Sequence, residues 1–517
     1  TILGEGMRVE QKGIIKNSIS RIIFVGLAVL AQVSWLIAIS HILVEYYTIA
    51  SVLVRILAVI LAIGVYDNSK NAMFKLSWII VILSLPVFGI CIYLLFGHKD
   101  SMRFIIKKFD YLAHHFLPYK NQDENIMLKL GAEDEYLLNQ SKYIKKYSGY
   151  PLYQNTDVEF FQETRIALAS MLKALEEAKE YIFMEYYAIE EAKVFEQISP
   201  ILKSKVKQGL DIRIIYDDVG SVGFIDPGFI RRMEAIGVKC RVFNPVHPIF
   251  NIFMNNRDHR KICVIDGIVG FTGGYNIADK YFSDSKRYGH WKDSGIKLTG
   301  DAVLSLTVMF LEMWSSVKDD EDYGRFLKKR EYKSKEDGFV QVYADSPLDE
   351  ESVSENAYLN LIKSAKYSVF ISTPYLIISD EMIRELNMAA QRGLDVRIVT
   401  PGIPDKRFIY GVTKSYYSSL VKSGIRIYKY SPGFLHQKGL IVDGRAAIVG
   451  TVNFDYRSLY HNFEDAVLLY KYKAIDEMYE DFIKLLEVSE EVSEKYKDVR
   501  RSLNIIHIIY RLIAPLL

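Results

Sequence analysis

Cysteine is scarce in this chain, and the cysteines form no recognisable framework. The 517 residues include 3 cysteines, Cys91, Cys240 and Cys263, which lie far apart in the sequence. A disulfide-stapled secreted fold needs paired cysteines, and a zinc site needs closely spaced ones. We therefore expect a reducing compartment, with Cys91 and Cys263 serving as small core residues in apolar runs.

An excess of charge of either sign is also missing. The 65 lysines and arginines nearly balance the 63 acidic residues, which leaves a net charge of +2. This balance by itself indicates neither an acidic nor a basic partner. The sequence also lacks histidine or carboxylate clusters with metal-ligand spacing. We expect the protein to need no metal ion and no cofactor.

Long apolar runs, in contrast, are abundant near the N-terminus. Apolar residues make up 50% of the chain, which is high for a soluble protein. Ile22–Val44 is uncharged and long enough to span a bilayer. Leu76–Phe96 is broken only by Pro86 and is predicted to span as well. Val52–Val65 is short and contains Arg55, so a span there is doubtful.

The flanks of these runs leave the membrane topology open. Residues 1–18 form an N-terminal tail, in which Thr1–Gly6 resembles a remnant of cloning before Met7. Residues 19–97 form a membrane region with two or three hydrophobic helices. Basic residues precede the first run and follow the third, and the positive-inside rule places both flanks in the cytoplasm. Three full spans cannot satisfy both flanks.

Two further segments have an amphipathic pattern. Residues 98–150 form a connector in which apolar residues are mixed with lysines and histidines. This pattern fits a helix on the membrane surface, or equally a helix packed on the following domain. Residues 500–517 are rich in isoleucine and leucine but contain Arg501 and Arg511. They are predicted to form an amphipathic helix for a bilayer surface or a partner groove.

The chain is organised around one pattern that occurs twice. The pattern is histidine, one residue, lysine, four residues, aspartate, six residues, glycine, two residues and asparagine. It is found at His259, Lys261, Asp266, Gly273 and Asn276, and again at His436, Lys438, Asp443, Gly450 and Asn453. Each residue type occupies about one position in twenty, so five fixed positions coincide by chance roughly once in a few million. The repetition is therefore not an accident of composition.

Each copy is predicted to fold as a strand, a turn and a second strand. Asp266-Gly267 and Asp443-Gly444 separate short apolar runs, and an Asp-Gly pair between such runs favours a β-hairpin. Two interpretations of these aspartates stay open, a catalytic role and a turn-forming role. The histidine and lysine of each copy lie two residues apart on a strand and so point to one face.

These residue types suit chemistry at a phosphodiester. A histidine can attack phosphorus or donate a proton near neutral pH. Lysine supplies positive charge for a non-bridging oxygen, and asparagine supplies N–H donors. One copy supplies half a site, whereas two facing copies supply both a nucleophile and an acid. The predicted catalytic residues are His259, Lys261, Asp266, His436, Lys438 and Asp443, and Asn276 and Asn453 are predicted to bind phosphate.

Both copies are embedded in alternating strands and helices. Tyr181–Met184 and Asp211–Tyr216 have the pattern of strands, and helical patterns lie between such segments. This alternation predicts an α/β fold with a largely parallel sheet covered on both faces. The same order of segments recurs after a polar joint at 328–337. We predict two duplicated lobes, at 151–327 and 338–495.

The doubled motif resembles the phospholipase D superfamily, and smaller motifs narrow the resemblance to bacterial cardiolipin synthases. Those motifs are Glu185-Tyr186-Tyr187, Tyr216-Asp217-Asp218-Val219-Gly220-Ser221, Trp291-Lys292-Asp293, Thr373-Pro374-Tyr375, Gly433-Phe434-Leu435-His436 and Asn462-Phe463-Glu464. The resemblance covers the chain from about residue 50 onward. It implies two phospholipase D-like lobes related by a pseudo-twofold axis, which share one active site and follow transmembrane helices.

The resemblance also implies an activity and a location. One phosphatidylglycerol would lose glycerol to give a phosphatidyl-histidine intermediate, and a second would accept the phosphatidyl group to give cardiolipin. The expected location is the bacterial inner membrane, with several spans and the catalytic domain on the cytoplasmic face. Lipids and the bilayer are the expected partners, nucleic acid is not, and a homodimer stays open. The alternatives are a phospholipase D-type hydrolase and a non-catalytic membrane scaffold.

Two carboxylates outside the repeated pattern also gain a role from the resemblance. Asp293 and Glu464 match positions where superfamily members hold a carboxylate against a catalytic imidazole, although surface salt bridging is the alternative. The first-motif histidine generally attacks in this superfamily, so His259 is the expected nucleophile. Its neighbours Arg257 and Arg260 should disfavour an imidazolium there and keep it neutral.

Overall fold

The first lobe is built on a seven-stranded sheet in the order β1-β9-β7-β6-β2-β3-β4. The strands are β1 (Thr156–Phe161), β2 (Tyr181–Tyr186), β3 (Asp211–Asp217), β4 (Lys239–Phe243), β6 (Lys261–Ile265), β7 (Val269–Gly273) and β9 (Gly295–Gly300). Strands β2, β3 and β4 are parallel, and the other neighbours are antiparallel. The expectation of a largely parallel sheet is therefore wrong, because the β6–β7 hairpin and β9 reverse the chain direction.

The second lobe repeats this strand order. Its sheet runs β10-β19-β17-β16-β11-β13-β14, with β20 added at the edge. The strands are β10 (Phe339–Asp345), β11 (Ser368–Ser372), β13 (Asp395–Pro401), β14 (Arg426–Tyr430), β16 (Gly439–Val442), β17 (Ala446–Gly450), β19 (Asn462–Tyr470) and β20 (Ser489–Glu491). The predicted duplication is thus present in the fold.

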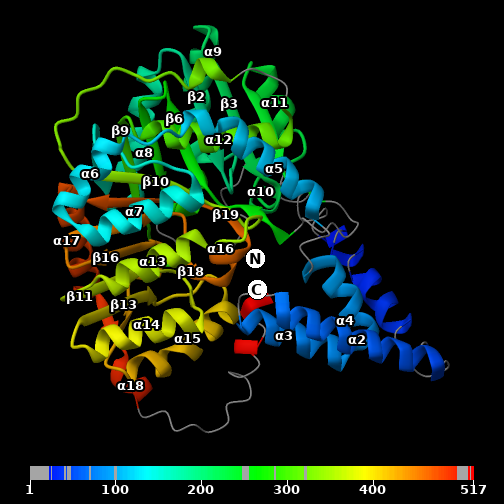
Figure 1. The fold of residues 1–517 in the computed structure, drawn as a ribbon. Coiled ribbons are helices and arrows are strands. Elements are labelled where there is room, and N and C mark those ends of the chain that lie inside the picture. Colours follow the sequence, from blue (N-terminus) through cyan, green and yellow to red (C-terminus); the bar gives the residue numbers. More distant parts are fainter. Residues whose placement is uncertain are drawn as a thin grey trace.

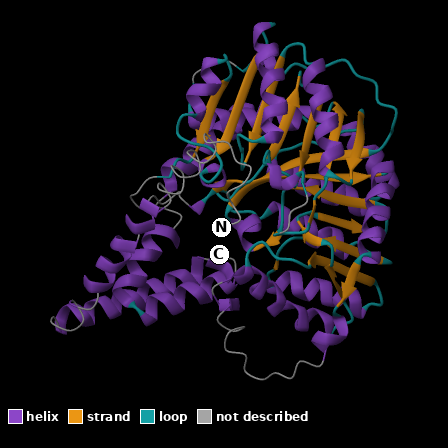
Figure 2. Ribbon diagram, turned by 180° about the vertical axis from the view of Figure 1, so that it is seen from behind, coloured by secondary structure: helices purple, strands orange, loops and turns teal. Residues whose placement is uncertain are grey.

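This architecture comes from a computed structural model, in which the two lobes stack one above the other (Figure 1). It describes residues 23–24, 26–28, 30–39, 42, 48–68, 72–97, 102–246, 255–283, 287–319, 323–497, 510–512 and 514–516. Viewed from behind, the strands of the two sheets run in clearly different directions (Figure 2).

Helices cover both faces of each sheet. In the first lobe, α8 (Thr164–Glu177), α9 (Lys193–Lys207) and α11 (Phe229–Ala235) pack on one face, and α12 (Val303–Val317) packs on the other. The second lobe carries α13 (Val353–Lys363), α14 (Asp380–Gln391), α15 (Arg407–Val421), α17 (Lys473–Glu487) and the short helices α16 (Tyr456–Tyr460) and α18 (Ser493–Lys497).

Helix α12 joins the two lobes. It contacts strands of the first sheet and also β10 of the second. Its sequence is apolar nearly all round, which suits a helix buried from both sides. One hydrophobic core therefore continues from the first sheet through α12 into the second lobe.

Two short parallel strand pairs cross between the lobes. β5 (Arg257–Asp258) pairs with the start of β19, and β8 (His290–Lys292) pairs with β15 (Gly433–Leu435). Each pair ends one residue before a motif histidine. The backbone N–H of His259 donates to Phe463 O at 2.9 Å, and that of His436 donates to Lys292 O at 2.7 Å.

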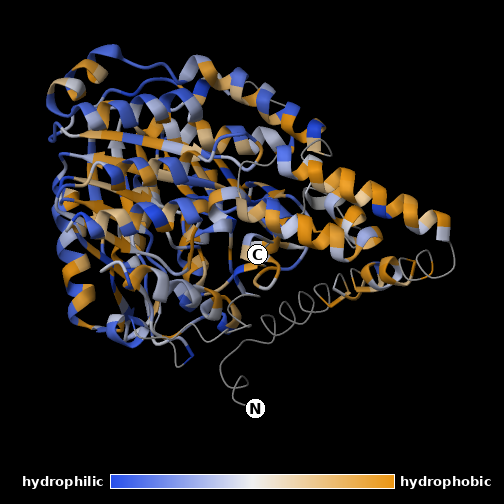
Figure 3. Ribbon diagram, turned by 60° about the horizontal axis from the view of Figure 1, so that its bottom comes forward, coloured by the Kyte–Doolittle hydropathy of each residue, from blue (hydrophilic) through white to orange (hydrophobic). Residues whose placement is uncertain are grey.

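The N-terminal helices project from the lobes as an apolar arm (Figure 3). Within the described residues, α2 (Thr48–Asn68) is the one helix long and apolar enough to span a bilayer, although its run was expected to be doubtful. The run expected to span with more certainty is divided into α3 (Ala72–Ser84), α4 (Pro86–Ile92) and a π-helical turn (Tyr93–Gly97). Proline cannot donate its backbone N–H, so the helix breaks before Pro86. Within Ile22–Val44, the described residues 23–24, 26–28, 30–39 and 42 are helical.

The connector packs on the lobes rather than standing apart. In α5 (Arg103–Phe116), Leu112 and Phe116 are buried against the catalytic core, and Phe109 stacks on Phe463. Phe104 on the same helix stays exposed. Helices α6 (Glu124–Glu133) and α7 (Glu135–Ser148) follow, and α7 packs on α13 and β10 of the second lobe.

The predicted C-terminal amphipathic helix falls mostly outside the described residues. Its described end lies between the second lobe and the apolar arm. Arg511 donates to Ser415 O at 2.7 Å, and Ser77 of α3 donates to Leu512 O at 2.6 Å.

Candidate active site

The two motif histidines are each held by a carboxylate from the other lobe. Nδ1 of His259 lies 2.8 and 2.9 Å from the carboxylate oxygens of Glu464, which is 205 residues away in the chain. Nδ1 of His436 lies 2.6 Å from Asp293 Oδ2. The crossing strand pairs produce this exchange, because each histidine and its carboxylate are the residues that directly follow the paired segments.

Both carboxylates are themselves held in place. Glu464 accepts hydrogen bonds from Thr451 Oγ1 and, at 3.2 Å, from Asn462 Nδ2. Asp293 Oδ1 accepts from the backbone N–H of Ser294 at 2.9 Å. With Nδ1 protonated and bound to a carboxylate, Nε2 of each imidazole is left for a substrate. Within the described part of the chain, no hydrogen bond is made to Nε2 of either histidine.

The two motif lysines lie beside the histidines that they follow. Lys261 Nζ donates to His259 O, and Lys438 Nζ donates to His436 O. Both ammonium groups are buried, and burial lowers the pKa of Lys261 to about 8 and that of Lys438 to about 7. Glu464 opposes the shift at Lys261, and Asp293 opposes it at Lys438. An anionic phosphate between them would favour the charged form of both lysines.

Burial shifts the histidines and their carboxylates in opposite directions. It lowers the pKa of both imidazoles well below the usual value, and Lys261 and Lys438 lower them further. It raises the pKa of Glu464 and of Asp293 to about 7, against the opposing charges of nearby lysines. A neutral imidazole beside an ionised carboxylate is therefore the form expected slightly above neutral pH.

His259 is expected to be neutral because of burial and the nearby lysines, and not because of its neighbours Arg257 and Arg260. Arg257 donates to Asp217 and to Asn244 O, and Arg260 lies 2.8 Å from Glu185 Oε1. Both arginines are thus engaged with other partners. Since His436 shows the same downward pKa shift, electrostatics do not single out one histidine as the nucleophile.

Comparison with known proteins decides the family. The sequence profile described as "Cardiolipin synthase, PLD-like domain" matches residues 171–303 and 358–486. A second profile, "Phospholipase D-nuclease N-terminal", matches residues 56–98. A cardiolipin synthase of Halalkalibacterium halodurans is 33% identical over 90% of this chain and 93% of its own length. The chain belongs to the cardiolipin synthase family of the phospholipase D superfamily.

Further relatives cover most of the chain. "Cardiolipin synthase 2" of Bacillus cereus is 35% identical over 88% of both chains. A protein of Streptococcus mutans described as uncharacterized is 38% identical, over 87% of this chain and 98% of its own length. The crystal structure of a phosphatidylserine synthase from Haemophilus influenzae covers 73% of this chain and 97% of its own, with a TM-score of 0.54 and 13% identity. The last comparison supports the fold alone.

The motif aspartates of this family member lie away from the histidines. Asp266 and Asp443 follow β6 and β16, at the opposite ends of these strands from the lysines. Both adopt a positive φ of 55°, as the hairpin turn requires. Each carboxylate accepts three backbone N–H groups at the start of the neighbouring strand, from residues 179–181 and 366–368 respectively. This geometry suits the turn-forming role, and neither carboxylate lies with the histidines.

The motif asparagines have unequal surroundings. Asn276 accepts from Ala188 N–H at 2.9 Å and donates to Tyr281 Oη at 2.8 Å, which leaves one N–H for a phosphate. The Oδ1 atom of Asn453 is buried without a partner among the described residues. Phosphate binding by both asparagines stays a prediction.

Sequence reasoning missed the aromatic wall around His436. The rings of Tyr281, Trp291 and Phe434 lie 5.4, 5.5 and 5.7 Å from its imidazole. It also missed Lys280 and Arg457, which each follow a motif asparagine by four residues. Continuing the repeat past the asparagines would have found this pair of cations.

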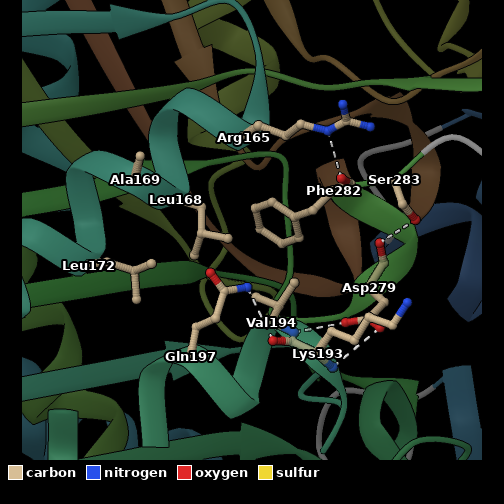
Figure 4. Close-up of a pocket in the computed structure, with 10 residues that line it drawn as sticks. All are labelled: Arg165, Leu168, Ala169, Leu172, Lys193, Val194, Gln197, Asp279, Phe282 and Ser283. Carbon is tan, nitrogen blue, oxygen red and sulfur yellow. Dashed lines mark hydrogen bonds between the residues drawn. The ribbon is translucent and has the colours of Figure 1, made fainter. Parts of the chain in front are cut away.

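A groove of about 400 Å³ lies on the first lobe next to this wall, between α8 and α9 (Figure 4). Asp279 and Phe282 line it, on either side of Lys280 and Tyr281. Asp279 accepts from the backbone N–H of Val194 at 2.9 Å, and Arg165 donates to Phe282 O at 2.9 Å. The groove therefore backs the short turn that carries Tyr281 into the site. Among the described residues, no group of three or more histidines, cysteines and carboxylates could hold a metal ion.

Proposed function

We propose that this protein is a cardiolipin synthase that transfers a phosphatidyl group from one phosphatidylglycerol to a second one. The observation that carries the proposal is the exchanged pairing of His259 with Glu464 and of His436 with Asp293. It supplies two imidazoles with fixed tautomers and available Nε2 atoms. Double-displacement chemistry at phosphorus needs one such group as nucleophile and the other as acid and base.

In the first step, Nε2 of neutral His259 attacks the phosphorus of phosphatidylglycerol. The P–N bond forms as the bond from phosphorus to the glycerol oxygen breaks. Protonated His436 donates its Nε2 proton to that oxygen, so glycerol leaves as the neutral alcohol. Asp293 stabilises the imidazolium of His436 before transfer, and Glu464 stabilises the positive charge that develops on His259.

In the second step, the terminal hydroxyl of another phosphatidylglycerol attacks the phosphatidyl-histidine. Neutral His436 takes the hydroxyl proton, the new P–O bond forms and the P–N bond to His259 breaks. His259 returns to its neutral form and cardiolipin is released. The products of the cycle are one cardiolipin and one glycerol from two phosphatidylglycerols, so atoms and charge balance.

The remaining polar groups bind the phosphate during both steps. Lys261 and Lys438 are placed to neutralise the non-bridging oxygens, and Asn276 and Asn453 can add N–H donors. The charge is supplied by the chain itself, so we propose turnover without a metal ion. Asp266 and Asp443 act through the hairpin turns and not on the phosphorus.

We further propose that the apolar arm anchors the enzyme in the bacterial inner membrane, with more than one membrane-crossing segment. The outer surface of α2 exposes large apolar side chains, among them Ile49, Leu53 and Ile60, and a lipid environment would cover them. The equal strand orders and the exchanged carboxylates support lobes related by a pseudo-twofold axis. A cytoplasmic position of the lobes belongs to the same proposal.

Identification of the products tests this function. Purified full-length protein in detergent micelles is incubated with phosphatidylglycerol alone, in excess EDTA, and the lipids and water-soluble products are separated. We expect cardiolipin and glycerol in equal amounts. Phosphatidic acid without cardiolipin would replace the transferase with a hydrolase, and turnover restored only by a divalent cation would overturn the metal-free chemistry.

A further inference from the structure

Lys280 is a lysine beside the active site without an acidic partner. It is half-buried, and its ammonium group lies over three aromatic rings. The distances to the ring centroids are 5.3, 5.1 and 5.3 Å for Phe224, Tyr281 and Trp291. Within the described residues, it forms no ion pair and donates no hydrogen bond. Aromatic faces attract a cation but leave its N–H donors available to a ligand.

The backbone that carries Lys280 is fixed on both sides. Asp279 N–H donates to Glu190 at 2.8 Å, and the Asp279 carboxylate accepts from the first turn of α9. On the other side, Thr164 Oγ1 donates to Tyr281 O at 2.6 Å. Figure 4 shows the anchoring of Asp279 and Phe282 around this turn. Lys280 therefore extends from a rigid support, as a binding residue should.

The position of Lys280 relates it to His436. Tyr281 and Trp291, which contact the ammonium group, also contact the His436 ring, with centroids 5.4 and 5.5 Å apart. The cation and the imidazole are thus separated by a single aromatic layer. The positive charge of Lys280 is also among the influences that lower the pKa of His436.

The surroundings of Lys280 favour an anion. Asp405 and Glu190 are the acids that act on it, but each is already engaged: Tyr375 Oη donates to Asp405 at 2.6 Å, and Asp279 N–H donates to Glu190. Two other cations, Arg287 and Lys406, act on Lys280 from nearby. With Lys280 included, three cations face two acids, and neither acid hydrogen-bonds to Lys280 in the described part of the chain.

We propose that Lys280 binds the phosphate of the acceptor phospholipid. This inference rests on the proposed function and adds a specificity residue to it. In the second step, His436 takes the proton of the acceptor hydroxyl, so the acceptor must lie on the His436 side of the reacting phosphorus. Its own phosphate is joined to that hydroxyl by three carbons. With bonds of about 1.5 Å, this bridge spans no more than about 7–8 Å between phosphorus atoms, which matches one aromatic layer.

The corresponding cation of the second lobe already donates a hydrogen bond within the protein. Arg457 occupies the equivalent position four residues after Asn453. It donates to Asn255 Oδ1 at 2.9 Å, and its charge acts on His259. The structure thus places an engaged cation near the attacking histidine and a lysine with free donors near the proton-accepting one. This difference assigns the acceptor to the Lys280 side.

The test compares two acceptors that share one covalent intermediate. Labelled glycerol regenerates phosphatidylglycerol and carries no phosphate, whereas phosphatidylglycerol as acceptor gives cardiolipin. For Lys280→Met, we expect the ratio of cardiolipin formation to glycerol exchange to fall by roughly ten- to a hundredfold, as for a lost charge-assisted contact. Lys280→Arg should restore much of the ratio. The matched control is Lys329→Met, since Lys329 is exposed and pairs with Asp301 at 3.4 Å.

The outcomes separate this inference from the proposed function. If the wild-type protein makes cardiolipin and exchanges glycerol, but Lys280→Met leaves their ratio unchanged, the acceptor subsite is wrong. A parallel loss of both reactions would overturn it too, because it would show a general role in the site. If the wild-type protein releases only phosphatidic acid, the proposed function itself fails, whatever Lys280 does.

Discussion

The two halves of the site follow one sequence pattern, but the residues around their histidines differ. His259 is flanked by Asp258 and Arg260, whereas His436 is flanked by Leu435 and Gln437. Glu185 lies beneath the first half, and the equivalent residue of the second is Ser372. The first half therefore contains a buried network around Arg260, in a place where the second half has the uncharged Ser372 and Gln437.

This network holds more carboxyl groups than cations. Arg260 Nε lies 2.8 Å from Glu185 and 3.3 Å from Asp258. The negative charge of Asp465 also raises the pKa of Arg260. Burial raises the pKa of Glu185 well above its usual value and that of Asp465 to about 7. Burial therefore favours a protonated carboxyl group in this network. In the other half, Gln437 donates to Asp481 at 3.3 Å, and Asp481 also pairs with Lys292 at 2.8 Å.

The lysines differ as well. Lys438 Nζ lies 2.8 Å from Nδ1 of His436, whereas Lys261 contacts His259 only through its carbonyl oxygen. The Lys438 charge disfavours a second proton on His436 until a bound phosphate draws the ammonium group away. The repeated motif thus places the same groups in both halves, while the residues around the two histidines differ.

Replacement of the histidines should lower cardiolipin formation more than any other substitution. It also tests most directly whether the two halves have different roles. We expect His259→Ala and His436→Ala each to lower cardiolipin formation by at least about 10⁴-fold, because the histidines act as a unit. A phosphatidyl ester of p-nitrophenol has a leaving group that needs no acid. It should restore a stoichiometric burst of p-nitrophenol in His436→Ala but not in His259→Ala.

The burst assay also tests the assignment of roles. A burst from His259→Ala and none from His436→Ala would show that His436 is the nucleophile and His259 is the acid. Near-normal cardiolipin formation by either variant, with the wild-type melting temperature, would contradict the two-histidine mechanism altogether.

Replacement of the carboxylates should have the next largest effect. Glu464→Gln and Asp293→Asn should lower kcat by roughly 10²–10⁴-fold, since the amide no longer favours the required tautomer or the imidazolium. With the p-nitrophenyl ester, Asp293→Asn should be rescued and Glu464→Gln should not. Glu355→Gln, which changes a buried carboxylate bound to Ser379 and Tyr460 and not to either histidine, serves as the control. Rescue in the opposite order would show that each carboxylate does not act through the histidine it contacts.

The pH dependence of kcat/KM should be bell-shaped and narrow. Below about pH 7, Glu464 and Asp293 take up protons and stop accepting the Nδ1–H hydrogen bonds. Above about pH 7–8, Lys438 and then Lys261 lose their charge and bind phosphate less well. Each limb should fall by about tenfold per pH unit. In Lys438→Arg, the permanent charge should move the alkaline limb upward, and an unmoved limb would assign it to another group.

The smallest effects are expected at the hairpin turns. Asp266→Asn and Asp443→Asn each replace a carboxylate that accepts three backbone N–H groups. We expect the free energy of unfolding to fall by about 1–3 kcal/mol, measured by denaturant titration. The activity of the protein that stays folded should change by less than about tenfold. A loss of activity as large as that of the histidine variants, at unchanged stability, would give these aspartates a catalytic role.

The sequence predicted the local parts of this fold well. The Asp-Gly pairs located both hairpins, and the repeated segments located both lobes, because turn chemistry and hydrophobic periodicity act over a few residues. The sheet was predicted as largely parallel, because alternation with helices does not reveal that β6 and β9 run against β2. A span at the second apolar run was predicted to be doubtful because the run contains Arg55, but the run lies within the continuous helix α2.

The site was predictable only as a set of residue types. The repeat identified His259 and His436, and family resemblance suggested Glu464 and Asp293. Which carboxylate meets which histidine depends on strand pairs between segments that lie more than 140 residues apart. Arg257 and Arg260 were expected to act on His259 from adjacent positions, but the backbone directs them to Asp217 and Glu185. Such directions follow from tertiary packing and not from distance along the chain.

The strand pairs that cross between the lobes also set an order of events during synthesis. His259 leaves the ribosome long before Glu464, so the first half has its nucleophile but not the carboxylate that orients it. β8 is likewise synthesised before its partner β15, and Asp293 before His436. A nascent or prematurely ended chain that stops before β19 therefore holds both repeated motifs in an unfinished site. In the proposed mechanism, catalysis therefore begins only after β19 has been synthesised and has paired with β5.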